Sequence, residues 1–113
     1  MMIGKDLVAA SATPLILSVL LRGESYGYEI IRQVRSVSNN QLDWSEGMVY
    51  PALRRLEQKG LLASRWGESE SGPKRKYYSL TKRGRAALAG EHDTWMIVHS
   101  TLQALREAPL CTT

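Results

Sequence analysis

The sequence predicts a single, mostly α-helical domain that carries one small β-hairpin, and three observations lead to this prediction. Apolar residues within 45–60 recur at the spacing of a helix. Two short runs, residues 61–66 and 74–80, have the composition of strands and flank a turn-rich segment at 67–73. Beyond them, apolar residues recur every seven positions from residue 88 onwards. Since 113 residues is the length of one domain, helices are expected on both sides of a single hairpin.

The N-terminal apolar run is the first predicted helix. Residues 14–21 are expected to form a buried helix, and residues 5–12 a shorter, more amphipathic lead-in that could dock on a neighbouring subunit. The whole run is too short to cross a bilayer. Arg22, Gly23 and Glu24 follow it in place of the small-residue cleavage site of a signal peptide. A membrane partner is therefore not expected.

A second helix is expected directly after the first. Gly23 is expected to close the first helix, and Ser25 to cap the second. The polar residues 38–40 end the pattern. The apolar side chains of the second helix recur at helical spacing, at Tyr26, Ile30, Val34 and Val37.

The third helix, within residues 45–60, has one face suited to burial and one suited to a groove of DNA. Val49, Leu53 and Leu56 fall at i, i+4 and i+7 and form the apolar face. Ser45 is the expected N-cap, which would direct the positive end of the helix towards a phosphate, and Gly60 is expected to end it. The opposite face carries a glycine, which lets the helix backbone approach DNA closely, and three side chains that can hydrogen-bond base edges. These residues are Gly47, Tyr50, Arg54 and Gln58.

The hairpin that follows has a basic tip. Its return strand begins with three consecutive cations, Lys74, Arg75 and Lys76. A solvated charged helix beside an ordinary hairpin would also explain each piece alone. In sequence, however, a helix with one basic face and a basic hairpin predict a winged helix-turn-helix, a DNA-binding domain in which the hairpin is the wing.

Aromatic residues near the wing are expected to be mainly structural. Trp66 is expected to anchor the wing against the helices, and Trp44 to fill a position just before the third helix. Because neighbouring strand residues face opposite sides, one of Tyr77 and Tyr78 should pack inwards and the other could touch the DNA backbone.

The charge of the chain is concentrated in this region. Residues 47–85 contain ten Lys and Arg against three acidic residues, a balance of +7, whereas the whole chain carries +4. The remainder therefore sums to −3. Such asymmetry is an argument about partners, and it indicates a polyanion, with double-stranded DNA as the leading candidate.

The last helix is expected to join two copies of the chain. Thr81 is its predicted N-cap. Its apolar residues follow a heptad pattern, imperfect at Glu91, and no segment remains within the chain to cover them. We therefore predict two parts, a DNA-binding domain at residues 1–80 and a dimerisation helix and tail at 81–113. A two-fold homodimer also suits a palindromic DNA site. The expected interface residues are Leu88, Trp95, Val98, Leu102 and Leu105.

Catalysis, metals and cofactors are not expected. His92 and His99 lie two helical turns apart, roughly 10 Å, too far to bind one ion within a chain. No phosphate loop, dinucleotide fingerprint or nucleophile elbow is present. The one cysteine, Cys111, cannot form an internal disulfide, which fits a reducing cytoplasm.

Three motifs resemble the PadR family of transcriptional regulators over nearly the whole chain. They are the segment 26–30 (YGYEI), the segment 47–57 (GMVYPALRRLE) with 60–62 (GLL), and the segment 76–81 (KYYSLT) with Gly84. The family more often has Thr and Leu where this chain has Met48 and Val49, so a phosphate contact by that hydroxyl is not expected here. The resemblance implies a homodimer that represses promoters, with a single C-terminal helix typical of the shorter subgroup.

We expect some of these residues to contact the bases of DNA and others to contact its backbone. Gly47, Tyr50 and Arg54 would enter or border the major groove, and Arg55 and Lys59 would approach its phosphates. The wing cations would hold the backbone or the minor groove.

One subgroup, the lactococcal-type multidrug repressors, is similar in placing a tryptophan midway along the last helix, where two copies stack planar cationic drugs. Trp95 stands at that position, with Asp93 nearby to add negative potential. Val8 and Ala12 would line the same pore. A ligand bound there would change the spacing of the two DNA-binding units and release the operator. Trp95 could instead merely fill the dimer seam. A repressor without a ligand, and a basic module that binds another protein, remain as alternatives.

Overall fold

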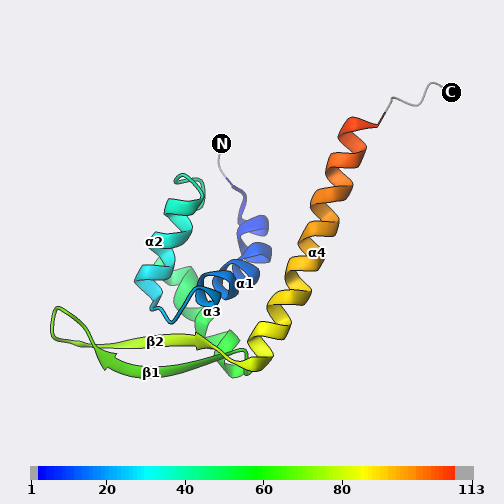
Figure 1. Ribbon diagram of the computed structural model, residues 1–113. Coiled ribbons are helices and arrows are strands. Elements are labelled where there is room, and N and C mark those ends of the chain that lie inside the picture. The colour runs from blue at the N-terminus through cyan, green and yellow to red at the C-terminus, as the bar shows by residue number, and fades with distance from the viewer. Residues whose placement is uncertain (1–2, 109–113) are drawn as a thin grey trace.

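The computed structural model describes residues 3–108, and in this part of the chain it contains four helices and one antiparallel hairpin (Figure 1). In chain order they are α1 (Lys5–Leu21), α2 (Gly27–Val37), α3 (Glu46–Gln58), β1 (Leu62–Glu68), β2 (Lys74–Leu80) and α4 (Lys82–Glu107). The predicted fold class is confirmed. Among the described residues, no helix is both long and apolar enough to cross a membrane.

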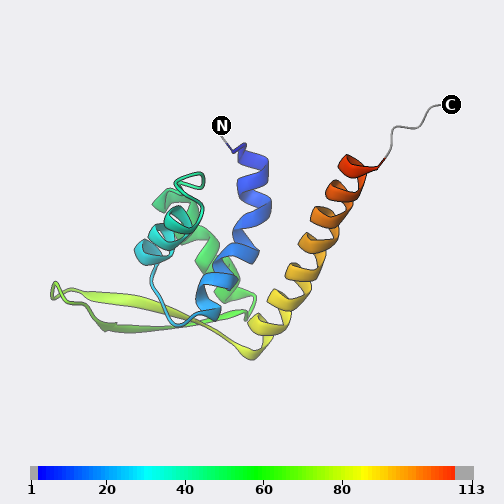
Figure 2. The ribbon, with the colours of Figure 1, turned by 45° about the horizontal axis from the view of Figure 1, so that its top comes forward.

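The core lies where α1, α2 and α3 meet, beside the inner end of the hairpin (Figure 2). Val49, Leu53 and Leu56 are at most 1% exposed, so the predicted apolar face of α3 is confirmed. Trp44 is 5% exposed and belongs to the same core, which agrees with its predicted structural role. The buried partners from α1 and α2 include Ile16, Leu17, Leu20, Ile30, Ile31 and Val34.

α1 is one continuous helix, which corrects the prediction of a separate lead-in before Pro14. A proline inside a helix removes one backbone hydrogen bond and usually ends or kinks the helix. Here burial favours continuation on both sides of the proline, because Ala12 and Ile16 are both in the core. The hydroxyl of Ser11 also donates to the carbonyl of Leu7 at 2.6 Å. Tertiary packing therefore outweighs the local signal.

Ser25 does not cap α2, contrary to the prediction. Tyr26 is the N-cap residue, and its side chain makes no capping hydrogen bond. Ser25 instead pairs with the second strand. Its N–H donates to the carbonyl of Tyr78 at 3.1 Å, and its carbonyl accepts from the N–H of Tyr78 at 2.7 Å. This pairing ties the start of α2 to the wing.

Thr81 joins the wing to α4 and to the end of α3. Its hydroxyl accepts from the N–H of Gly84 at 3.0 Å, which confirms the predicted cap, and donates to the carbonyl of Gly60 at 2.7 Å. Its own N–H donates to the carbonyl of Leu61 at 3.1 Å. Gly60 has a φ of +79°, the left-handed conformation predicted for the residue that follows a helix. Three elements therefore meet in one hydrogen-bonded unit.

α4 extends beyond the other helices and gives the molecule its elongated shape (Figure 1). Its first turns pack on α1, and Leu88 is buried there with 8% exposed. Leu88 is thus used within the chain, which corrects its assignment to the seam between subunits. Further along, the apolar residues Met96, Ile97, Val98, Leu102 and Leu105 are 46–71% exposed.

Candidate nucleic-acid interface

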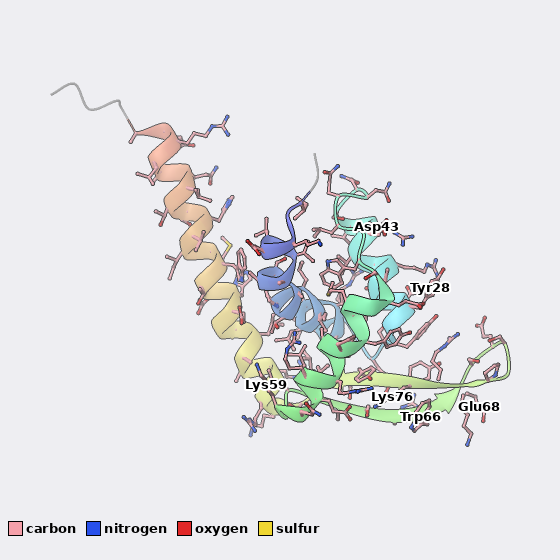
Figure 3. The ribbon with its side chains drawn as sticks, turned by 180° about the vertical axis from the view of Figure 1, so that it is seen from behind. Tyr28, Asp43, Lys59, Trp66, Glu68 and Lys76 are labelled. Atoms are coloured by element: carbon pink, nitrogen blue, oxygen red, sulfur yellow. The ribbon has the colours of Figure 1, made fainter. Side chains whose placement is uncertain are left out.

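The face of α3 that points away from the core is open to solvent. Gly47, Tyr50, Arg54 and Gln58 are all exposed, and they alternate with the buried residues of the same helix. Ser45 caps the helix as predicted, because its hydroxyl accepts from the N–H of Met48 at 3.2 Å. Figure 3 shows α3 in front of the other helices, with the wing extending to one side. The side chains predicted to meet a groove therefore share one open surface.

Tyr50 occupies the space above Gly27, the first residue of α2. A Cβ atom at position 27 would lie 2.6 Å from a ring carbon of Tyr50, so a side chain there would displace the ring. Partial burial raises the pKa of the Tyr50 phenol, and the nearby Glu46 carboxylate adds to the effect. The phenol therefore stays neutral at physiological pH and keeps a proton that it can donate.

The two flanks of α3 differ in charge. On the flank towards the wing, the Glu57 carboxylate accepts from the Ser64 hydroxyl at 2.5 Å and pairs with Lys76 at 3.4 Å. Helical spacing of 3.6 residues per turn puts Arg55 and Lys59, which are exposed, on the other flank. Arg55 and Lys59 are therefore open to a partner.

The contacts of Glu57 with Ser64 and Lys76, here called the Glu57 cluster, predict that stability depends on pH. The hydrogen bond from Ser64 and the pairing with Lys76 lower the pKa of Glu57 below its ordinary value. A lowered carboxyl pKa in the folded state contributes stability above the unfolded pKa, about 4.3, and this contribution is lost as the pH falls through the folded value. We expect Glu57→Gln to be less stable than the parent protein at pH 7 and to show a flatter loss of stability on acidification.

Urea unfolding between pH 7 and pH 3 measures this effect. Glu70→Gln is the matched control, because it removes the same charge from an exposed position in the wing turn. Parallel pH curves for Glu57→Gln and the parent protein would show that the cluster does not contribute.

The three wing cations are not equivalent. Lys74 is exposed near the tip. Arg75 is half-buried, and its guanidinium carbon lies 3.8 Å from the centre of the Tyr26 ring, within cation–π distance. Lys76 is held by Glu57 and lies 5.4 Å from the centre of the Tyr78 ring. The sequence predicted the same role for all three, whereas the structure leaves Lys74 the most accessible.

A hollow of about 400 Å³ separates the wing from the helices. Cations line one side, and the uncapped start of α2, with its positive helix end, lines the other. Its walls are formed by residues 26–28 at the start of α2, Tyr50 of α3, Trp66 of β1 and, from the wing, Ser69, Ser71 and residues 73–76. The hollow therefore has the wing cations on one side and the start of α2, whose first turn also carries Glu29, on the other.

An ion pair between the wing and the segment before α2 was not predicted from the sequence. Two side-chain nitrogens of Arg65, Nε and Nη2, donate to the carboxylate of Glu24, at 2.8 and 2.6 Å. This bidentate bond lowers the pKa of Glu24 and raises that of Arg65. The residues are 41 positions apart, and only the strand register places them together. Arg65 is thus structural, and it fixes the wing to the segment before α2.

Two aromatic predictions have different outcomes. Trp66 was predicted to anchor the wing, but it is 67% exposed, so that prediction is wrong. Trp66 lies on the same face of the hairpin as Tyr78, but nearer the tip, where that face borders the hollow and not the core. Tyr78, which is 4% exposed, is the aromatic residue that packs inwards. Tyr77 is half-buried, and its hydroxyl donates to the carbonyl of Glu68 at 3.0 Å.

The residues predicted to bind a ligand lie apart from the DNA-facing surface. Trp95 is half-buried and Asp93 is exposed on α4, while Val8 is half-buried on α1. Ala12 is 2% exposed and belongs to the core, so little of it is left to line a pore. No group of three or more potential metal ligands occurs among the described residues. Cys111 lies outside the described part of the chain.

Comparison with a family model gives a match over most of this architecture. Residues 16–90, which include α2, α3 and the wing, match the model described as the transcriptional regulator PadR-like family. The chain is also 30% identical over 106 residues to an uncharacterized protein of Lysinibacillus sphaericus, with 94% of this chain and 97% of the relative covered. A transcriptional regulator of Escherichia coli, YqjI, is 29% identical over 90 residues, covering 80% of this chain but only 42% of that protein.

Solved structures have the same fold. A PadR-like transcriptional regulator from Bacillus cereus is similar with a TM-score of 0.80 at 28% identity, covering 93% of this chain and 100% of the other. A transcriptional regulator from Clostridium thermocellum is similar with a TM-score of 0.79 at 29% identity, covering 88% and 96%. The arrangement of α1 to α4 around the wing is thus common to these regulators.

Proposed function

Because this chain belongs to the transcriptional regulator PadR-like family, we propose that it is a homodimeric repressor that reads a palindromic operator with α3 and the wing. One observation carries the proposal. Tyr50 of α3 lines one hollow together with the wing cations Lys74, Arg75 and Lys76, and the exposed Arg54 lies on the same face of α3 as Tyr50. A DNA duplex needs both parts together, since base edges give specificity and phosphates give position.

In this proposal α3 enters the major groove. Gly47 lets the helix backbone approach the bases, and Tyr50 and Arg54 bond base edges, with arginine suited to guanine. Arg55 and Lys59, on the flank away from the wing, contact the phosphates on that side of the groove. Ser45 aims the N-terminus of α3 at another phosphate.

The DNA backbone on the other side of the groove passes through the hollow. The positive end of α2 attracts a phosphate there, and Lys74 neutralises a neighbouring one. Arg75 and Lys76 supply charge from positions fixed by Tyr26 and Glu57. Fixed cations lose little side-chain freedom on binding, so they favour a single register of DNA on the protein.

A second copy of the chain is the partner proposed for the distal half of α4. This half exposes several large apolar side chains without a partner among residues 3–108. Such a surface favours association, and two-fold symmetry matches a palindrome. The proposed interface residues are Trp95, Val98, Leu102 and Leu105.

The proposed control is a planar cationic ligand between the two copies of Trp95. Paired indoles offer a π face to a cation, and Asp93 adds negative charge. The ligand would release DNA only if it binds better to the spacing of the DNA-binding units that does not fit the operator. Val8, half-buried on α1, would complete the lining.

The test of operator binding is fluorescence anisotropy with DNA from upstream of the gene and with a scrambled duplex, at several salt concentrations. Binding on the order of 10⁻⁸ M at physiological salt, for the upstream duplex alone, is the expected result. Equal and steeply salt-dependent binding to both duplexes would instead indicate an electrostatic patch.

The ligand is tested separately with a planar cationic dye such as ethidium. The dye should quench the fluorescence of the parent protein. It should also release the parent protein from the upstream duplex. The variant Trp95→Ala should show neither response. Quenching that persists in Trp95→Ala, or equal dye affinity of free and DNA-bound protein, would count against this control.

A further inference from the structure

The wing carries an exposed tryptophan, Trp66, that does not belong to the hydrophobic core. Trp66 is 67% exposed, whereas Trp44 is buried and Trp95 is half-buried. A single exposed apolar residue is normal and needs no explanation. Trp66, however, lies in a particular place, since it lines the hollow between the wing and the start of α2.

Exposed aromatic side chains are grouped around that hollow. Tyr28 at the start of α2 is 52% exposed and Tyr50 of α3 is 44% exposed, and both line it together with Trp66. Lys74 stands at the same hollow, and Lys76 is the register partner of Trp66 across the hairpin. Figure 3 shows Trp66 and Lys76 on the wing and Tyr28 on α2. Aromatic faces next to cations are the combination that binds nucleic-acid chains, because the rings cover sugar and base surfaces while the cations hold the phosphates.

We propose that Trp66 is a DNA-contacting residue, whose indole packs against the deoxyribose of the backbone strand that passes through the hollow. This inference rests on the proposed function, and it assigns to the wing an apolar contact in addition to its charges. The contact is to the backbone, because Trp66 stands on the wing among the phosphate-binding cations and not on the face of α3 that meets the bases. It therefore strengthens binding to every sequence alike.

The mechanism follows from the position of the side chain. Truncation of a large aromatic side chain that contacts a partner is among the costlier changes in an interface. Because most of the indole is exposed, folding gains little from it, and its loss should affect binding rather than stability. Salt should not change the contribution of the indole, since the contact releases no counterion. These properties separate Trp66 from Lys74, whose removal reduces the salt slope by about one unit.

The experiment compares Trp66→Ala, Trp66→Phe and Lys74→Ala with the parent protein, on the upstream duplex and on its scrambled counterpart. Trp66→Ala should weaken binding to both duplexes by about tenfold with an unchanged salt slope and an unchanged unfolding midpoint. Trp66→Phe should recover part of the affinity. Val37→Ala, which truncates an apolar residue that is 72% exposed at the far end of α2, is the matched control and should bind like the parent protein.

A direct signal comes from acrylamide quenching in a Trp95→Phe background. Trp66 is then the accessible tryptophan of the described chain, because Trp44 is buried. Either duplex should protect the fluorescence from acrylamide. Protection that appears without DNA as the protein concentration rises would mean that Trp66 contacts a second copy, and the proposal would be overturned.

The experiment distinguishes an error in the proposed function from an error in the proposed Trp66 contact. If the parent protein binds the scrambled duplex as well as the upstream one, operator reading fails while the Trp66 contact remains measurable. If the parent protein binds no DNA, the proposed function itself is wrong. If the parent protein binds and Trp66→Ala binds equally well, with its fluorescence unprotected, then only the inference about Trp66 is wrong.

Discussion

Gly84→Ala should destabilise the protein by about 2–3 kcal/mol, because position 84 has no room for a side chain. A Cβ atom there would lie 2.1 Å from the carbonyl oxygen of Leu61 and 3.1 Å from a methyl carbon of Leu80. The first of these contacts is with backbone, and the same carbonyl accepts the N–H of Thr81. Relief of the clash would therefore have to move the root of the wing away from α4.

Gly90→Ala on the same helix is the matched control. The structure shows nothing within 4 Å of a Cβ atom at position 90. Alanine is favoured over glycine inside a helix by roughly 0.5–1 kcal/mol, so this variant should be slightly more stable than the parent protein. Urea unfolding followed by circular dichroism, at one fixed protein concentration, measures both. Stabilisation by both substitutions would mean that α4 does not pack this closely on the wing root.

Arg54→Ala should abolish most of the preference for the operator over the scrambled duplex. If Arg54 makes a bidentate hydrogen bond to guanine, its loss should cost about 1–3 kcal/mol of the preference for guanine over the other bases. The variant should fold normally, because Arg54 is exposed and the core residue beside it, Leu53, is unchanged. Anisotropy titrations with both duplexes measure the ratio of affinities directly.

The adjacent arginine provides the comparison. Arg55 lies next along α3 and carries the same charge, but it points to the flank where we place phosphates. Arg55→Ala should weaken binding to both duplexes equally and reduce the salt slope by about one unit. If both variants lower affinity without altering sequence preference, α3 does not read bases through Arg54.

Local sequence signals were sufficient for the hairpin and the later helices, and for three of the helix ends. Ser45 and Thr81 cap their helices, and Gly60 adopts the conformation that ends one, because these roles depend on hydrogen bonds within three or four residues. The apolar face of α3 was equally clear, since periodicity alone defines which side chains are buried. The family resemblance extended this reading from fold to DNA binding.

Features that depend on contacts between distant segments could not be predicted in this way. Ser25 has the composition of a cap, yet it pairs with β2, and nothing near it in sequence indicates that strand. The bond between Glu24 and Arg65 needs the register of the hairpin. Pro14 looked like a helix break, and only the burial of residues on both sides explains why α1 continues.

Heptad spacing alone also misassigned one position on the last helix. Leu88 fits the repeat with Trp95 and Leu102, but α1 covers it within the same chain. Periodicity shows that a face is apolar and leaves open which surface covers it. The same ambiguity affected Trp66, which shares a face of the hairpin with Tyr78 but lies nearer the tip, beyond the core that buries Tyr78.

The hydrogen-bonded joint around Thr81 makes α4 a lever. Since the joint fixes the start of α4 to both α3 and the wing, the DNA-binding unit must follow any tilt of that helix as one body. A helix of 26 residues is about 39 Å long. In a dimer held by the distal half of α4, a tilt of about 5° would displace the other end by about 3 Å, close to the rise of one base pair. A small rearrangement at the distal end would therefore be enough to put the two halves of a palindrome out of register.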